Sequence, residues 1–177
     1  MTPIRIFAIA AAVGGITALG AAVQVRAGGD KVAFPEGFEK WVLYATVDRD
    51  KINQYRELYT SQAAIDAVKA GKPTPSGTVV VLVQWAAKVD DKKMPIKGAD
   101  GRFVKDRIVG YTVMEKRTGW GTEYPADIRN GEWEYQAFTA DKKPNAKAVL
   151  ANCFKCHKPL DKADYLFSYD RMKSAAK

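Results

Sequence analysis

Thr78-Val-Val-Val-Leu-Val-Gln-Trp85 is the stretch that decides the fold of this 177-residue chain. It is β-branched almost throughout and apolar on both faces, a pattern that favours a strand in the middle of a sheet. Working outward from it, the sequence predicts earlier strands over 41–46 and 55–59 and later strands over 103–116 and 132–139. A polar, Lys-, Asp- and Gly-rich loop is expected over 89–101.

Two helices complete the predicted elements. Ser61 is expected to cap a short helix over 63–70, and Gly71 to end it. Near the C-terminus, Pro144 is expected to open an Ala-rich helix that continues through two cysteines. Because strands come first and a helix last, we predict an α+β fold in which the C-terminal helix carries the two cysteines.

The segment Cys153-Phe-Lys-Cys156-His157 carries the attachment signature of a c-type haem. Each thiol can add to one vinyl group of the porphyrin, and the adjacent imidazole is then held beneath the iron. We therefore predict one covalent haem c, attached through Cys153 and Cys156, with His157 as the proximal iron ligand.

A Cys-x-x-Cys motif also occurs in zinc sites, redox pairs and structural disulfides. A structural zinc site needs four protein ligands, and a chain with two cysteines and one histidine would have to supply acids as well. A thioredoxin-like redox pair normally opens a helix after a strand, whereas this motif follows a helical stretch and is trailed by His157. A plain structural disulfide is the third alternative.

The N-terminal residues have the pattern of an export signal. Arg5 is followed by an uncharged apolar stretch, and Val25-Arg26-Ala27 resembles a cleavage site. We predict a signal peptide over 1–27 and one haem domain over 28–177, in the periplasm or otherwise exported, although an uncleaved anchor helix is the alternative. Removing Arg5 and Arg26 lowers the formal charge from +8 to +6. Such a surface suits an acidic redox partner, and its scattered lysines do not indicate nucleic acid.

Four segments carry a further pattern: Phe34-Pro-Glu-Gly-Phe-x-x-Trp-Val-x-x-x-Thr46, Gly77-Thr-Val-x-Val81, Ala151-x-Cys-x-x-Cys-His-Lys158 and Asp164-x-x-Phe167. Together they resemble the cytochrome P-460 family, whose members include hydroxylamine-oxidising cytochromes P-460 and gas-binding cytochromes c′-beta. The resemblance implies a mainly antiparallel sheet with a few helices, a homodimer, and a five-coordinate haem whose open face is covered by sheet residues.

Two departures from the family weigh against oxidation chemistry. In the hydroxylamine-oxidising members a lysine joined to the porphyrin occupies the place of Leu82, and a glutamate over the iron occupies the place of Thr112. Leucine has no nucleophilic nitrogen, and threonine is a poor general base without an activating partner. The catalytic role of those members is therefore not expected here.

Strand alternation extends the predicted distal face, the side of the haem opposite the histidine. If Leu82 and Thr112 face the haem, Val80, Gln84, Gly110 and Met114 do too. A mostly apolar face suits a small neutral ligand such as nitric oxide. The alternative is that these are only core residues of a sheet.

His157 is the only histidine, so a sixth ligand from this chain would be Met94, Met114, Met172 or a lysine. Three functions follow from these residues. The first is a binding protein for nitric oxide or a similar diatomic, the second an electron-transfer cytochrome with Met114 as sixth ligand, and the third a hydroxylamine or nitric oxide oxidase. The third would need a cross-link from another lysine, such as Lys88.

Overall fold

The fold is built on one five-stranded antiparallel sheet with the order β1-β2-β3-β4-β5. The computed structural model describes residues 31–175, so the predicted signal peptide over 1–27 lies outside the described residues. The middle strand is β3, as its apolar sequence predicts. The strands are β1 (Val42–Arg49), β2 (Gln54–Thr60), β3 (Val79–Ala87), β4 (Lys105–Lys116) and β5 (Trp133–Thr139).

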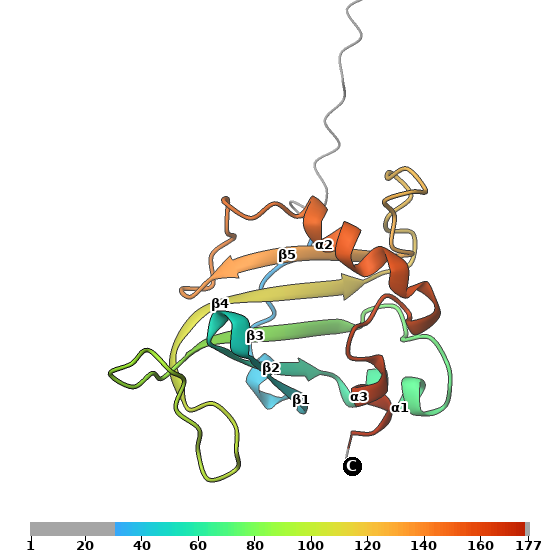
Figure 1. Cartoon of the computed structure of the whole chain (residues 1–177). Helices are drawn as coiled ribbons and strands as arrows, with labels where there is room; N and C mark the ends of the chain where they lie inside the picture. Colours follow the sequence, from blue (N-terminus) through green and yellow to red (C-terminus); the bar gives the residue numbers. More distant parts are fainter. Residues whose placement is uncertain (1–30, 176–177) are drawn as a thin grey trace, which may run out of the picture.

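The helices lie between β2 and β3 and after β5 (Figure 1). They are α1 (Gln62–Lys69), α2 (Ala151–His157) and α3 (Tyr169–Lys173), with 3-10 turns η1 (Phe38–Lys40), η2 (Asp50–Ile52) and η3 (Lys158–Ala163). From α2, beside β5, the chain runs through η3 to α3, which packs on α1 and β1. The predicted α+β class is therefore confirmed. Within residues 31–175 no helix is both long and apolar enough to cross a membrane.

The two faces of the sheet are covered by different parts of the chain. On one face, Phe154, Leu166 and Met172 from the C-terminal segment pack in one cluster with sheet residues such as Val80 and Met114. On the other face, the aromatic rings of the N-terminal segment pack edge to face on rings of the sheet. The site residues described below lie on the face covered by the C-terminal segment.

Helix α1 forms as its sequence predicts. The Ser61 hydroxyl accepts a hydrogen bond from the Ala64 N–H at 3.3 Å, which satisfies one free donor of the first turn. Gly71 follows the helix with φ +70°, a conformation that glycine adopts without steric cost. Ile65 and Val68 are fully buried and hold the helix against the core. The chain after α1 then enters the loop that contributes Thr74 to the network described below.

Pro144 does not open the C-terminal helix, contrary to the sequence prediction. It forms an isolated antiparallel bridge with Phe138 of β5, which is also paired with Tyr111 of β4, and α2 begins only at Ala151. Proline lacks an N–H, which suits both the first turn of a helix and the unpaired side of a strand end. The prediction chose the wrong one of these two positions.

Candidate functional site

A cavity of about 780 Å³ lies between the sheet and the C-terminal segment. Its volume is within the range of cofactor sites in proteins. It brings together seven of the site residues predicted from the sequence, although they come from β3, β4 and α2: Val80, Leu82, Thr112, Met114, Cys153, Cys156 and His157.

Helix α2 turns its cysteines toward this cavity because its one large apolar side chain is anchored on the other side. Phe154 is 1% exposed, and its ring lies 5.0 Å from the ring of Tyr124 and 4.8 Å from that of Tyr135. Cys153 and Cys156, three residues apart, share one side of the helix. Both thiols are free, so the cysteines do not form the disulfide considered above. Burial, followed by the charge of Cys156, raises the pKa of Cys153.

The imidazole of His157 is oriented by a single backbone hydrogen bond. Its Nδ1 lies 2.6 Å from the carbonyl oxygen of Tyr165. A carbonyl only accepts, so Nδ1 carries the proton and donates, and Nε2 keeps its lone pair for a metal. Burial lowers the pKa of His157, which favours the neutral ring that a metal ligand needs, although the hydrogen bond to Tyr165 acts in the opposite direction. The rings of Tyr135 and Phe167 flank the imidazole at 5.0 and 4.9 Å.

The sheet side of the cavity is arranged in cross-strand rows. Met114 pairs with Val80 on one side and with Tyr135 on the other, so this row lies next to the His157 ring. Leu82 pairs with Thr112 in the next row along the strands. Met114 is thus the methionine nearest to the histidine end of the cavity, and Leu82 and Thr112 lie about two residues, or roughly 7 Å, further along the sheet.

The remaining two members of the predicted distal face have structural roles. The Gln84 amide donates to the Thr112 hydroxyl at 3.1 Å and does not itself line the cavity. Gly110 does not line it either: a Cβ there would lie 2.7 Å from the Phe138 carbonyl oxygen, so close pairing with β5 requires glycine. The side chain of Thr112 is therefore engaged within the sheet.

Three arginines that sequence reasoning missed also line the cavity. Arg49 and Arg56 come from the β1–β2 hairpin and Arg171 from α3. Arg56 donates to the Gln54 side chain at 3.1 and 3.2 Å, and Arg171 donates to the Thr46 carbonyl at 3.0 Å. The arginine ion pairs found within residues 31–175 involve other residues, namely Arg102, Arg107 and Arg117.

The prediction of a mostly apolar cavity wall therefore holds only in part. The end of the cavity that the three arginines line is positively charged. Burial lowers the pKa of Arg56, and the neighbouring charge of Arg49 adds to the effect. Alternation in β2 could have identified Arg56, since it stands two residues from Leu58, which also lines the cavity.

The other candidate ligands lie elsewhere. Met94 is 61% exposed in the 88–104 loop, and Met172 is the fully buried residue of α3. Lys88 is exposed just after β3, and neither lysine, aspartate nor glutamate is found among the described residues that line the cavity. Met114 is therefore the one methionine of the described chain that reaches this space.

The donor set fits a haem. Two free thiols and an imidazole with an available Nε2 lie at one end of the cavity. Guanidinium groups, which bind carboxylates, lie at the other end, and apolar side chains of the sheet line the space between them. Zinc fits less well, because no group of three or more His, Cys, Asp or Glu side chains within residues 31–175 is arranged to hold a metal.

Comparison with known proteins agrees with this arrangement. The model of the family described as cytochrome P-460 matches residues 35–168, which cover the sheet, the Cys-x-x-Cys-His motif and the turn that contacts His157. No curated protein matches the chain at a significant level.

Proposed function

This chain belongs to the cytochrome P-460 family, and from that premise we propose that it is an exported, homodimeric mono-haem c-type cytochrome that binds nitric oxide or a similar small diatomic. Family membership supports a haem c cytochrome of the P-460 and c′-beta kind. The covalent attachment, the single haem, the export and the gas ligand belong to the proposal.

Different cavity residues are suited to different parts of the haem. Cys153 and Cys156 would form the thioethers, and Nε2 of His157 would bind the iron. The arginines of the β1–β2 hairpin are the cavity cations that would bind the carboxylates of the haem propionates. Bound there, haem supplies an iron centre that can accept a small neutral ligand.

The composition of the cavity wall is the observation that carries the proposal. None of the described lining residues is a lysine or a carboxylic acid, and the wall at Val80 and Leu82 is apolar. The described wall therefore offers neither the general base nor the lysine cross-link that oxidation would need. The Thr112 hydroxyl is not a substitute for the base, because it already accepts a hydrogen bond from Gln84. The apolar part of this wall admits a neutral diatomic, whereas the arginines described above are the part of the cavity that attracts anions.

Electron transfer is the second candidate, because Met114 lines the cavity. Met114, however, stands in the cross-strand row of Tyr135, whose ring contacts the His157 ring, so it lies on the histidine side of the cavity. This placement favours an open sixth position over methionine ligation.

The ferrous optical spectrum, recorded with and without nitric oxide, tests the proposal. We expect a five-coordinate high-spin ferrous haem that takes up nitric oxide directly, and the same behaviour from Met114→Leu. That substitution removes the sulfur but conserves volume, so it should cost less than about 1.5 kcal/mol of stability. A low-spin wild type that Met114→Leu converts to high-spin would replace the gas-binding proposal with the electron-transfer one.

Removing one cavity arginine tests the assignment of the propionate end. We expect Arg56→Gln to lower the midpoint potential, because the lost positive charge no longer favours the reduced iron. A Coulomb energy of about 1 kcal/mol, for ~15 Å and an effective dielectric of ~20, corresponds to roughly 50 mV. Redox titration measures it, with the exposed, Asp106-paired Arg107→Gln as control. Equal potentials in wild type and Arg56→Gln would contradict the assignment.

A further inference from the structure

The turn that contacts His157 has an unfavourable backbone. Asp164 and Tyr165 are consecutive, and their φ angles are +49° and +59°. Side-chain-bearing L-residues rarely adopt this left-handed region, and two in succession persist only where their surroundings hold them. Local hydrogen bonds from Asp164 N–H to the Asp161 carbonyl and from Tyr165 N–H to the Leu160 carbonyl close the turn on η3. They do not attach it to the sheet.

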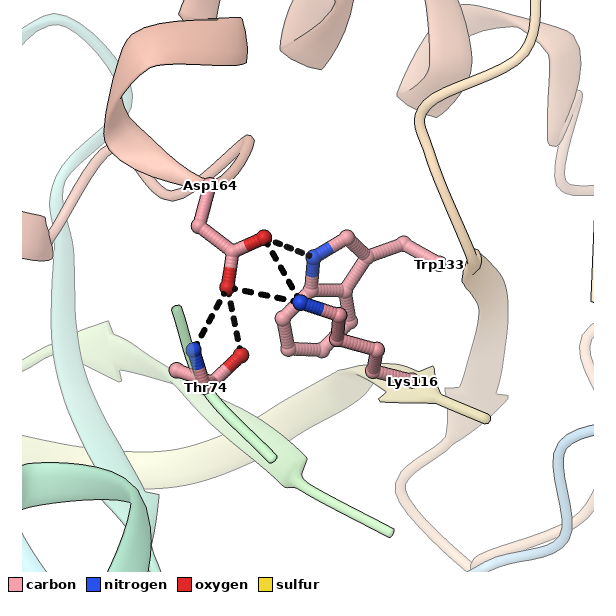
Figure 2. A network of polar contacts seen from close by, with 4 residues as sticks. All are labelled: Thr74, Lys116, Trp133 and Asp164. Carbon is pink, nitrogen blue, oxygen red and sulfur yellow. Dashed lines mark hydrogen bonds and ion pairs between the residues drawn. The ribbon is translucent and has the colours of Figure 1, made fainter. Parts of the chain in front are cut away.

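The side chain of Asp164 makes that attachment (Figure 2). Its Oδ2 accepts from the Thr74 N–H at 3.0 Å and from the Thr74 hydroxyl at 2.5 Å. Lys116 Nζ donates to both carboxylate oxygens at 2.9 and 3.1 Å, and the Trp133 indole N–H lies 3.4 Å from Oδ1. We call these four residues the Asp164 network. It joins the turn to the loop before β3, the end of β4 and the start of β5.

The same turn presents the acceptor for the histidine. The residue after Asp164 is Tyr165, whose carbonyl oxygen accepts from His157 Nδ1 at 2.6 Å. The carboxylate therefore holds a turn, the turn places a carbonyl, and the carbonyl orients the imidazole. Lys116 also lies two residues beyond Met114 on β4, so the network ties the turn to a strand that lines the cavity.

We propose that Asp164 is a positioning residue for the iron ligand: through the Tyr165 carbonyl it sets the direction of the His157 imidazole and the strength of its Nδ1–H hydrogen bond. This inference rests on the proposed role of His157. A stronger hydrogen bond at Nδ1 makes the imidazole a more basic ligand, and more basic ligation favours the oxidised iron. Asp164 thereby acts on the haem without touching it.

The chain contains a matched control for this network. Glu57 is a buried carboxylate that accepts from Lys105 Nζ at 2.8 Å and from the Trp85 indole N–H at 2.9 Å. Glu57 thus accepts hydrogen bonds from a lysine and a tryptophan, as Asp164 does. Because its neighbour Leu58 lines the cavity, Glu57 points to the opposite face of the sheet. Glu57→Gln should cost stability without altering the haem.

The experiment compares holoprotein of wild type, Asp164→Asn, Asp164→Ala and Glu57→Gln. Resonance Raman spectra of the ferrous protein give the iron–histidine stretching frequency, and redox titration gives the midpoint potential. We expect Asp164→Ala to lower and broaden the iron–histidine band and to raise the potential, with Asp164→Asn in between because its amide oxygen can still accept. Thr74→Val, which removes one donor only, should give a smaller change of the same sign. Glu57→Gln should lower the melting temperature alone.

The outcomes separate this inference from the proposed function. Unchanged band and potential in Asp164→Ala, or equal shifts in Glu57→Gln, would show that Asp164 only stabilises the fold. A wild type that shows the band but does not take up nitric oxide would refute gas binding and leave the inference standing. If the His157→Ala variant gives the same band and the same potential as the wild type, the ligand assignment is refuted, and the inference with it.

Discussion

Replacing both cysteines, Cys153→Ala with Cys156→Ala, is expected to abolish covalent haem entirely. The two thiols are free, lie on one side of α2 and line the same cavity as His157. Each can form one thioether, so the double variant has no remaining tether, whereas each single variant keeps one. After acidified acetone, haem should stay with the wild-type protein and with the single variants at reduced yield, and it should leave the double variant completely.

Mass spectrometry of the intact protein checks the same point and adds a second. The wild type should weigh the mature chain plus one haem, without the loss of hydrogens that a further cross-link would cause, because Leu82 stands where the lysine of the oxidising members is expected. Asn152→Ala, on the same helix and lining the same cavity, is the matched control and should retain its haem fully. Haem that acidified acetone extracts from the wild type would overturn the covalent assignment.

Replacing His157 is expected to have the second largest effect. In His157→Gly the cysteines still hold the haem, but the chain contains no other histidine to bind the iron. The variant should lose the iron–histidine stretching band and show an altered ferrous spectrum. Added imidazole should restore both, because the substitution leaves a space shaped for that ring between Tyr135 and Phe167.

Phe167→Leu provides the control for this prediction. It removes one of the two rings that flank the imidazole but leaves the ligand and its hydrogen bond to Tyr165 in place. Its band should therefore persist without added imidazole. An unchanged spectrum in His157→Gly would mean that another residue binds the iron, and Met114 would then be the first to test.

The strands could be predicted from the sequence because each carries its own pattern. The doubly apolar run around Val81 identifies the middle strand, and Ser61 with Gly71 marks both ends of α1. Pro144 was misplaced because a residue without an N–H satisfies two different positions equally well. The prediction was therefore correct where a pattern fits one local structure, and wrong at Pro144, which fits both a helix start and a strand end.

The site could be predicted in part for the same reason. Cys153, Cys156 and His157 form a contiguous motif, and the resemblance to the family singled out Leu82 and Thr112, which pair with each other across β3 and β4. Asp164 was missed because its role depends on a contact between segments that are distant in sequence: it meets Thr74 across 90 positions. Arg56 could have been found by alternation with Leu58 in β2, but an apolar face was expected there. A left-handed turn without glycine, such as the one at Tyr165, has no local signal at all.

The strand order described above also bears on how the protein acquires its haem. Every strand pairs with a strand adjacent in sequence, so no pairing within the sheet has to wait for a segment beyond β5. The last strand ends at Thr139, and the attachment motif begins only at Cys153. In a chain that emerges N-terminus first, the sheet can therefore assemble before the cysteines are presented. The sheet wall of the cavity would then already be formed when the haem is attached. Cys156, which is exposed, would remain accessible for that reaction.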